Sequence, residues 1–222
     1  MTTDVTPDQE PLPLRRAQTN LTEERIVAAA TELFVSDGYQ ATTLEAVAKR
    51  ARVGARTVYV RFGTKAMLFK RVVDVAIVGD TAPVDVLGRD WMQRAMTAPT
   101  AAERIAASAA ATRQIMERSG ALFAVAQQAA AVEPLIESEF QAGRLGTRKS
   151  YEVFWTAMAT DGMLPAGADV EWLIDTSAVL GAAETYLLVT KLSGGDLDRY
   201  EQWLATNWTR LAAASAGPAT PG

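Results

Sequence analysis

Residues 25–69 read RIVAAATELFVSDGYQATTLEAVAKRARVGARTVYVRFGTKAMLF, and this stretch decides the fold. Two short helical patterns, Thr42–Arg50 and Gly54–Phe62, are joined by only three residues, Ala51 to Val53. A helical segment precedes them and another follows. Two short helices joined by a tight turn form the element whose second helix enters the major groove of DNA. The stretch therefore predicts a helix-turn-helix that contacts DNA.

Capping signals set the boundaries that we expect for these helices. Asn20 with Glu23, and Thr42 with Glu45, have the spacing of capping boxes, so we expect helices to begin between Asn20 and Thr22 and again at Thr42. Gly38 suits the left-handed position that ends a helix. A fourth helix is expected from about residue 64 to about residue 78. The apolar positions of these helices predict a core that holds Ile26, Phe34, Val47, Val53, Val58 and Phe62.

Composition excludes several classes of chemistry. The chain has 222 residues, is 49% hydrophobic, and contains neither Cys nor His. Disulfides, thiolate metal sites and catalysis by a histidine base are therefore excluded, and we expect no catalytic site, metal or cofactor. The sequence lacks a signal-peptide pattern and any run of 18 apolar residues, so we expect a cytoplasmic protein without a membrane span.

Charge is distributed unevenly along the chain. The net charge is −4, but residues 14–71 hold 11 Lys or Arg against five Asp or Glu, a net charge of +6. Residues 1–13 carry three acids and no base, and residues 72–222 carry 18 acids against 11 bases. A basic module joined to an acidic body is expected when only one end of a protein meets phosphate.

The remainder of the chain also reads as helical. We expect a flexible arm over 1–18, with Arg15 and Arg16 placed to reach a minor groove or to stay solvated, the DNA-binding domain over 19–66, a helical body over 67–214 and a flexible tail over 215–222. In the body, helices are expected at 101–118, 122–131, from 134 through 158, from 169 to about 192 and at 197–214, with a loop at 161–168.

Residues 25–69 resemble the DNA-binding domain of the TetR family of transcriptional regulators. The shared pattern includes Gly38-Tyr39, Thr42-Thr43, Val47-Ala48, Thr57-Val58-Tyr59 and Phe62, at fixed spacing. Four residues depart from it: Gly54 stands where a capping Ser is usual, Arg52 and Arg56 stand where Gly is frequent, and Arg61 occupies a position that is often aromatic or His. The resemblance implies an all-α fold with an N-terminal three-helix DNA-binding domain and a C-terminal bundle for dimerisation and ligand binding.

Candidate DNA contacts follow from the residue types and from the resemblance. Arg56 lies in the first turn of the second short helix and can bind guanine bidentately, while Ala55 and Val60 offer apolar contact to thymine methyl groups. Hydroxyl groups and an ammonium group are suited to phosphate. The full set is Thr43, Ala55, Arg56, Thr57, Tyr59, Val60, Arg61 and Lys65.

The resemblance implies that the body forms a homodimer on a palindromic operator and senses a small molecule. The expected dimer interface lies in the last two helices and comprises Ala178, Gly181, Ala182, Leu187, Leu188, Trp203 and Trp208. An apolar ligand pocket is expected from Trp91, Met92, Met96, Met116, Phe123, Phe154, Trp155 and Met158, although such a stripe also suits plain core. Glu152, Asp175 and Glu184 are candidate polar anchors.

The sequence leaves more than one function open. The first hypothesis is a dimeric repressor that a small apolar or amphipathic ligand releases from DNA. The second is a DNA-binding regulator without such a ligand, either constitutive or gated by a protein, and an activator is also compatible. An enzyme is disfavoured because no pair of carboxylates, Lys or Tyr stands at a suggestive spacing.

Overall fold

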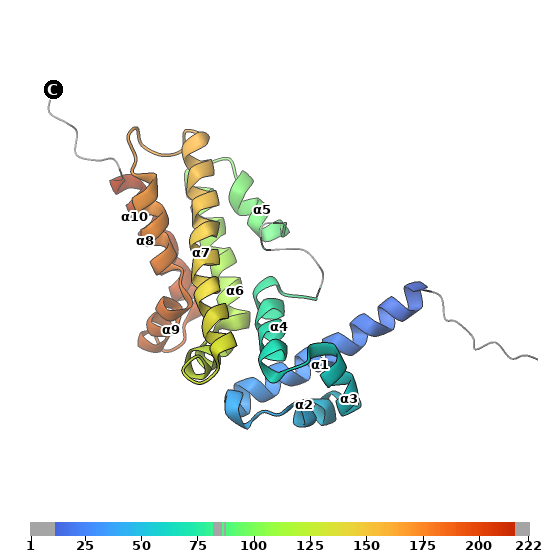
Figure 1. The fold of residues 1–222 in the computed structure, drawn as a ribbon. Coiled ribbons are helices and arrows are strands. Elements are labelled where there is room, and N and C mark those ends of the chain that lie inside the picture. The colour runs from blue at the N-terminus through green and yellow to red at the C-terminus, as the bar shows by residue number, and fades with distance from the viewer. Residues whose placement is uncertain (1–11, 82–85, 87, 216–222) are drawn as a thin grey trace, which may run out of the picture. The chain divides into compact units, whose positions relative to one another are not determined.

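The structure, a computed structural model, describes residues 12–81, 86 and 88–215, and the ten regular elements in those residues are all helices. The predicted all-α fold is therefore confirmed. The chain divides into two compact units, Met1–Val72 and Val73–Gly222, and the boundary falls inside helix α4 (Lys65–Val78) (Figure 1).

The N-terminal unit contains α1 (Leu12–Ala41), α2 (Leu44–Ala51), α3 (Ala55–Phe62) and the first half of α4. Four of the six predicted core residues are completely buried, whereas Val53 and Phe62 are half-buried. An aromatic cluster holds α1 against α4, with the Phe34 and Phe69 ring centroids 4.9 Å apart and those of Tyr39 and Phe69 5.6 Å apart. The completely buried apolar side chains of this unit are Ile26, Ala30, Phe34, Val47, Val58, Leu68 and Val72.

Two predicted helix starts in this unit are wrong. Helix α1 begins at Leu12, so Asn20 lies inside the helix rather than at its cap. Helix α2 is capped by Thr43, whose side chain accepts a hydrogen bond from the Ala46 amide, and not by Thr42. The Thr42 hydroxyl is buried and donates instead to the carbonyl oxygens of Leu33 and Gly38, because these carbonyls at the end of α1 need a partner.

The end of α1 matches the prediction. Gly38 has φ 81° and ψ 172°, a non-helical conformation inside the segment, so the regular part of α1 ends there. The structure describes only part of the expected arm over 1–18. Residues 1–11 lie outside the described residues, and so do the side chains of Arg15 and Arg16, while the backbone of 12–18 is helical. Of the expected tail, residues 216–222 also lie outside the described residues.

The C-terminal unit is built around α6 (Ala101–Ala129), which contacts α5 (Asp90–Thr97), α7 (Pro134–Thr160), α9 (Ala183–Leu192) and α10 (Leu197–Ala214) (Figure 1). Helix α8 (Val170–Leu180) packs mainly on α7. Local signals explain several boundaries: Pro134 occupies the first turn of α7, and Asp169 and Asp196 cap α8 and α10 by accepting backbone amide hydrogen bonds.

One helix of the C-terminal unit is longer than predicted. Residues 101–118 and 122–131 were expected to form separate helices, but α6 runs through them without a break. Gly120 is needed for packing rather than for a turn. A Cβ at this position would lie 2.3 Å from Cε1 of Tyr186, so only glycine lets the tyrosine ring approach the helix backbone.

Another helix is broken where continuity was predicted. The segment 169–192 forms α8 and α9, which meet at an angle of 56° around Gly181 and Ala182. A Cβ at Gly181 would lie 2.0 Å from the hydroxyl oxygen of Tyr151, and the Thr185 hydroxyl donates to the Val179 carbonyl oxygen at the break. In the described residues, no single helix is long and apolar enough to cross a membrane, and only the bent pair α8–α9 meets that test when its two helices are combined.

Candidate nucleic-acid interface

The turn between α2 and α3 is short and is fixed by hydrogen bonds from its own backbone and from Arg25 of α1. Arg52, Val53 and Gly54 join the helices, one residue later than predicted. The Arg52 amide donates to the carbonyl oxygens of Ala48 and Lys49, and its backbone is left-handed, with φ 56° and ψ 46°. Arg25 of α1 donates from Nη2 to the carbonyl oxygens of Ala51, at 2.6 Å, and Arg52, at 3.1 Å, which fixes the end of α2 on α1.

The surface of α3 is divided into a buried and an exposed side. Val58 is completely buried, whereas Arg56 and Thr57 are exposed and Val60 is 77% exposed. Ala55 is half-buried in the first turn. The Arg56 guanidinium forms no hydrogen bond or ion pair with the described part of the chain, and Gly54, which caps the helix, is itself exposed. Arg56 and Val60, which are four residues apart, therefore share an exposed face, and Ala55 is less accessible.

Tyr59 has an intramolecular partner that the sequence did not indicate. Its ring is 44% exposed, and its hydroxyl donates to the Glu45 carboxylate of α2. This hydrogen bond raises the pKa of Tyr59 and is also the main cause that lowers the pKa of Glu45. The Thr43 side chain, exposed at the cap of α2, contributes a smaller lowering of the pKa of Glu45. Two of the predicted phosphate-binding hydroxyls thus lie beside one carboxylate.

The structure gives Arg61 a different role from the predicted DNA contact. Its Nη2 donates to the Thr19 carbonyl oxygen at 2.9 Å, and its guanidinium forms an ion pair with Glu23 at 3.2 Å. Arg71 of α4 binds the other oxygen of the same carboxylate at 2.8 Å. Glu23 thereby joins α1, α3 and α4. Because the Arg61 side chain is only about one-fifth exposed, packing explains it better than DNA contact.

Lys65 is also engaged within the unit. Its ammonium donates to the carbonyl oxygens of Tyr39, at 2.8 Å, and Gln40, at 3.2 Å, and lies 4.3 Å from the centre of the Tyr39 ring. These contacts tie the start of α4 to the end of α1. One of its three ammonium protons has no such contact and stays available for a phosphate oxygen.

The predicted pocket residues lie mostly in the core of the C-terminal unit. Met116, Phe154, Trp155 and Met158 are buried in its main hydrophobic cluster, and Met96 and Phe123 pack against that cluster. Trp91 and Met92 are half-buried on α5. Core packing accounts for the four buried side chains, so their assignment to a pocket stays a prediction. Among the predicted polar anchors, Glu152 pairs with Lys149, Asp175 with Arg148, and Glu184 with Arg144.

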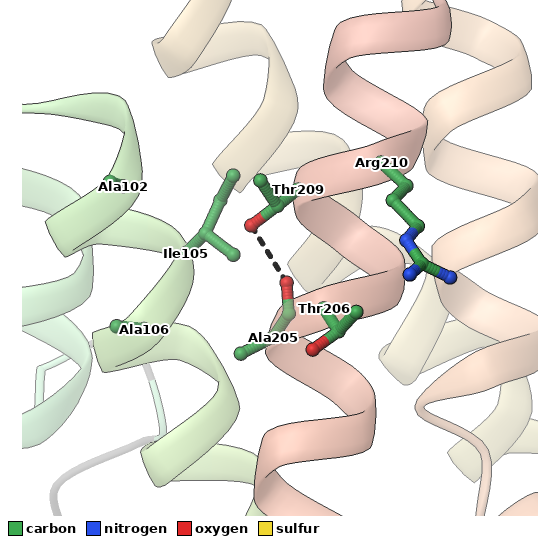
Figure 2. A pocket seen from close by; sticks show the side chains of 7 residues that line it. All are labelled: Ala102, Ile105, Ala106, Ala205, Thr206, Thr209 and Arg210. Atoms are coloured by element: carbon green, nitrogen blue, oxygen red, sulfur yellow. Dashed lines mark hydrogen bonds between the residues drawn. The ribbon is translucent and has the colours of Figure 1, made fainter.

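A shallow groove in this unit has other lining residues. It has a volume of about 350 Å³ and lies between α6 and α10. Figure 2 shows Ile105 directed toward Thr209, whose hydroxyl donates to the Ala205 carbonyl oxygen, and Arg210 directed away from α6. None of the eight predicted pocket residues lines this groove, which is bounded by Ala102, Ile105, Ala106, Ala205, Thr206, Thr209 and Arg210.

The predicted dimer residues divide into available and unavailable side chains. Leu188 is exposed, and Ala178, Ala182, Leu187 and Trp203 are half-buried. Two predictions need correction. Trp208 is completely buried, with its ring 5.3 Å from that of Tyr151, and Gly181 is covered by the same tyrosine. Both residues pack within their own chain and offer no surface to a partner.

Sequence reasoning missed the acids of the N-terminal unit. Glu23 and Glu45 were interpreted only as capping residues, yet they bind Arg61 and Tyr59, which lie 38 and 14 positions away in the chain. No sequence pattern marks such pairs, because they depend on how the helices pack.

Among the described residues, no group of three or more Asp or Glu is arranged to hold a metal ion.

The comparisons with known proteins agree with this geometry. Residues 26–72 match the sequence profile described as bacterial regulatory proteins, tetR family. No curated protein matches the sequence.

Among solved structures, the chain is similar to a transcriptional regulator from Rhodococcus sp. Rha1, with 15% identity, a TM-score of 0.62, and coverage of 88% of this chain and 98% of that one. It is similar to SmeT in complex with triclosan, with 19% identity, a TM-score of 0.66, and coverage of 90% and 97%. It is also similar to MexZ, a repressor of Pseudomonas aeruginosa, with 19% identity, a TM-score of 0.58, and coverage of 87% and 96%. At these identities the shared feature is the fold.

The profile covers α2, α3 and the parts of α1 and α4 that pack on them, and the fold similarity extends over most of the chain. The resemblance of residues 25–69 is thereby confirmed: residues 26–72 match the tetR family of bacterial regulatory proteins, and the chain shares its all-helical fold with these solved structures.

Proposed function

We propose that this protein is a homodimeric transcriptional repressor that binds a palindromic operator and is released from it by a small apolar or amphipathic ligand. The observation that carries the DNA-reading part is the Arg56 guanidinium. It stands exposed in the first turn of α3 and has no partner in the described part of the chain. An arginine that is free at the start of a recognition helix is suited to the O6 and N7 atoms of guanine.

The other DNA contacts have different roles in this proposal. Ala55 and Val60 contact bases through apolar surface, whereas Thr43, Thr57 and Tyr59 donate to phosphate oxygens. Phosphate contacts fix the position of α3 but carry no sequence information.

Dimerisation is proposed through α8 and α9. Apolar side chains gather on these helices without cover from their own chain: Val179 is 65% exposed, Leu188 59% and Leu192 79%, and no residue of α9 is buried. Exposed apolar side chains on two adjoining helices are suited to a protein interface. A two-fold dimer would present two α3 helices to half-sites about 34–36 Å apart.

A ligand site in the C-terminal unit is supported by buried polar groups. The Tyr200 hydroxyl and the Trp208 indole N–H are buried and have no hydrogen-bond partner among the described residues. Buried donors of this type require a partner, which a small molecule with an acceptor group can supply. SmeT was solved with triclosan, and MexZ is a repressor. By analogy, we propose that a small molecule controls DNA binding by this protein, and that the protein meets its operator DNA in the cytoplasm.

Helix α4 is the proposed route from ligand to DNA, since it continues from the DNA-binding unit into the C-terminal unit. Arg118 of α6 donates to the carbonyl oxygens of Ala76, at 3.0 Å, and Ile77, at 2.8 Å, near the end of α4. A ligand that shifts α6 would therefore act directly on α4. A ligand releases DNA only if it binds better to the state that does not fit DNA.

Selection of bound duplexes from a random DNA pool tests the proposal. We expect enrichment of a palindrome, and sedimentation should give the mass of a dimer. Arg56→Ala should relax the base preference at one base pair of each half-site. Lys49→Ala removes the same charge from an exposed position on α2 and should leave that base preference unchanged. Absence of an enriched palindrome would refute the proposal.

The alternative functions give different results. In one outcome, the dimeric protein binds the palindrome, while a panel of apolar and amphipathic compounds fails to release the protein from DNA and leaves amide exchange in residues 64–78 unchanged. That result favours a regulator that is constitutive or gated by a protein. In vitro transcription from a promoter that contains the selected site distinguishes repression from activation.

A further inference from the structure

Glu45 places a negative charge among the side chains proposed to bind phosphate. It lies in the first turn of α2, and its carboxylate accepts the Tyr59 hydroxyl of α3. Helices α2 and α3 pack on one another (Figure 1). The Glu45 and Tyr59 side chains are both exposed. No Lys or Arg pairs with this carboxylate in the described part of the chain, in contrast to Glu23 and Glu32, which pair with arginines. The carboxylate is therefore not neutralised locally.

The groups around this carboxylate are those that a phosphate oxygen uses. Hydrogen bonding from Tyr59, then from its own backbone amide and from Thr43, lowers the pKa of Glu45, so the group is ionised near neutral pH. Hydroxyls and backbone amides at the start of a helix are also the usual donors to DNA phosphate. The same few donors would thus serve the Glu45 carboxylate in the free protein and a DNA phosphate in the complex.

The hydroxyl cannot serve both anions through its proton. A tyrosine hydroxyl has one proton to donate, and an ionised carboxylate is an acceptor only. When Tyr59 donates to a phosphate oxygen it must leave Glu45, and the carboxylate then faces a like charge with no cation beside it. Both consequences oppose DNA binding, and neither depends on base sequence.

Building on the proposed DNA binding, we propose that Glu45 is an internal competitor for DNA phosphate. It holds the Tyr59 hydroxyl in the free protein and weakens binding to every duplex alike. Glu45 is in this sense a positioning residue that sets the level of non-specific affinity, while Arg56 sets sequence preference.

The test needs no knowledge of the operator, because a mixed-sequence duplex of 30 base pairs is the probe. Glu45→Gln removes the charge and keeps the shape of the side chain. At low salt we expect it to bind the probe about threefold to tenfold more tightly than the wild type. The slope of log affinity against log salt should become steeper by up to about 0.9 per subunit, the value for one phosphate contact.

A double-mutant cycle separates the hydroxyl from the charge. In the wild type, Tyr59→Phe should change affinity by less than about twofold, because the hydrogen bond to phosphate only replaces the one that Tyr59 makes to Glu45 in the free protein. In a Glu45→Ala background the same change should weaken binding by about threefold or more, since the hydroxyl is then free to bind phosphate. Additive effects of the two substitutions would overturn the exchange of the hydroxyl.

Asp37→Asn is the matched control. It removes one negative charge from the same unit, and the Asp37 carboxylate accepts from Ser36 rather than from a predicted DNA-binding residue. Circular dichroism melts establish that all variants are folded. If Glu45→Gln gains no more affinity than Asp37→Asn, the inference is wrong. If the wild type and all variants fail to bind any duplex, the proposed function fails and the inference fails with it.

Discussion

Arg52→Gly should stabilise the N-terminal unit, and the structure gives the size of the effect. Arg52 has φ 56° and ψ 46°, and it is the one non-glycine residue with positive φ among those described. The left-handed conformation costs an L-residue about 1–2 kcal/mol because Cβ crowds the carbonyl oxygen. Glycine removes that cost but loses about 0.5–1 kcal/mol through greater freedom in the unfolded chain. Taken at the middle of both ranges, the net gain is about 0.75 kcal/mol.

The side chain gives no reason to expect a compensating loss. The Arg52 guanidinium is exposed and forms no hydrogen bond or ion pair with the described residues, and the bonds at this position are made by the backbone. Those bonds remain in the glycine variant. For a unit of this size, the gain corresponds to a rise in melting temperature of about 2–8 °C.

Amide exchange of α2 and α3 measures the effect locally, and tryptophan fluorescence provides an internal reference. All five tryptophans follow Val72 in the sequence, so their fluorescence reports the C-terminal unit alone and should not change. Lys49→Gly is the matched control, since Lys49 is exposed and helical and its replacement should destabilise α2 by about 1 kcal/mol. Equal or lower exchange protection in Arg52→Gly would refute the assignment of strain to this turn.

Three further predictions concern the C-terminal unit. Gly181→Ala should lower its unfolding free energy by about 1–3 kcal/mol, because the new Cβ would meet the Tyr151 hydroxyl at 2.0 Å, and tryptophan-monitored urea unfolding measures the loss. Ser177→Ala should cost about 1–3 kcal/mol in the same assay, since it leaves the buried indole N–H of Trp155, now 2.8 Å from the serine hydroxyl, without an acceptor. Burial raises the pKa of Tyr151 and of Tyr200, so the folded state keeps protons that the unfolded state releases above about pH 10. Stability should therefore fall as pH rises beyond that value, and a phenolate titration in which both tyrosines ionise below pH 10 without unfolding would contradict this.

Local signals predicted helix boundaries well where the cap and its partner are close in sequence. Asp169 and Asp196 each accept from the amide three residues later, and Pro134 lies in the first turn of α7, so these helices begin close to the predicted starts at 134, 169 and 197. Thr42 and Thr43 show the limit of this logic. Both can cap α2, and the choice depends on the carbonyls at the end of α1, one of which lies nine residues away.

Two predicted helix boundaries were wrong for a related reason. Residues 101–118 and 122–131 were expected to form separate helices, and Gly181 was expected to lie inside one continuous helix over 169–192. In the structure α6 is continuous and the break is at Gly181, and Gly120 and Gly181 both admit a tyrosine ring from another helix. A glycine in a helical pattern reports a need for space or for backbone freedom, and the sequence alone does not say which need applies.

The charge count illustrates the same point for the DNA-binding surface. A net charge of +6 over residues 14–71 suggests a broad cationic face. In the structure, however, Arg25 caps α2, Arg50 pairs with Glu32, and Arg61 is paired with Glu23. These cations hold the unit together, so they contribute less to phosphate binding than their number implies. Three exposed cations have no partner in the described part of the chain: Lys49, Arg52 and Arg56. They lie in and beside the turn between α2 and α3, so we expect most of the DNA affinity to come from this region. With so few free cations, an uncompensated acid such as Glu45 weighs heavily, and this is why a single neutralising substitution should be measurable.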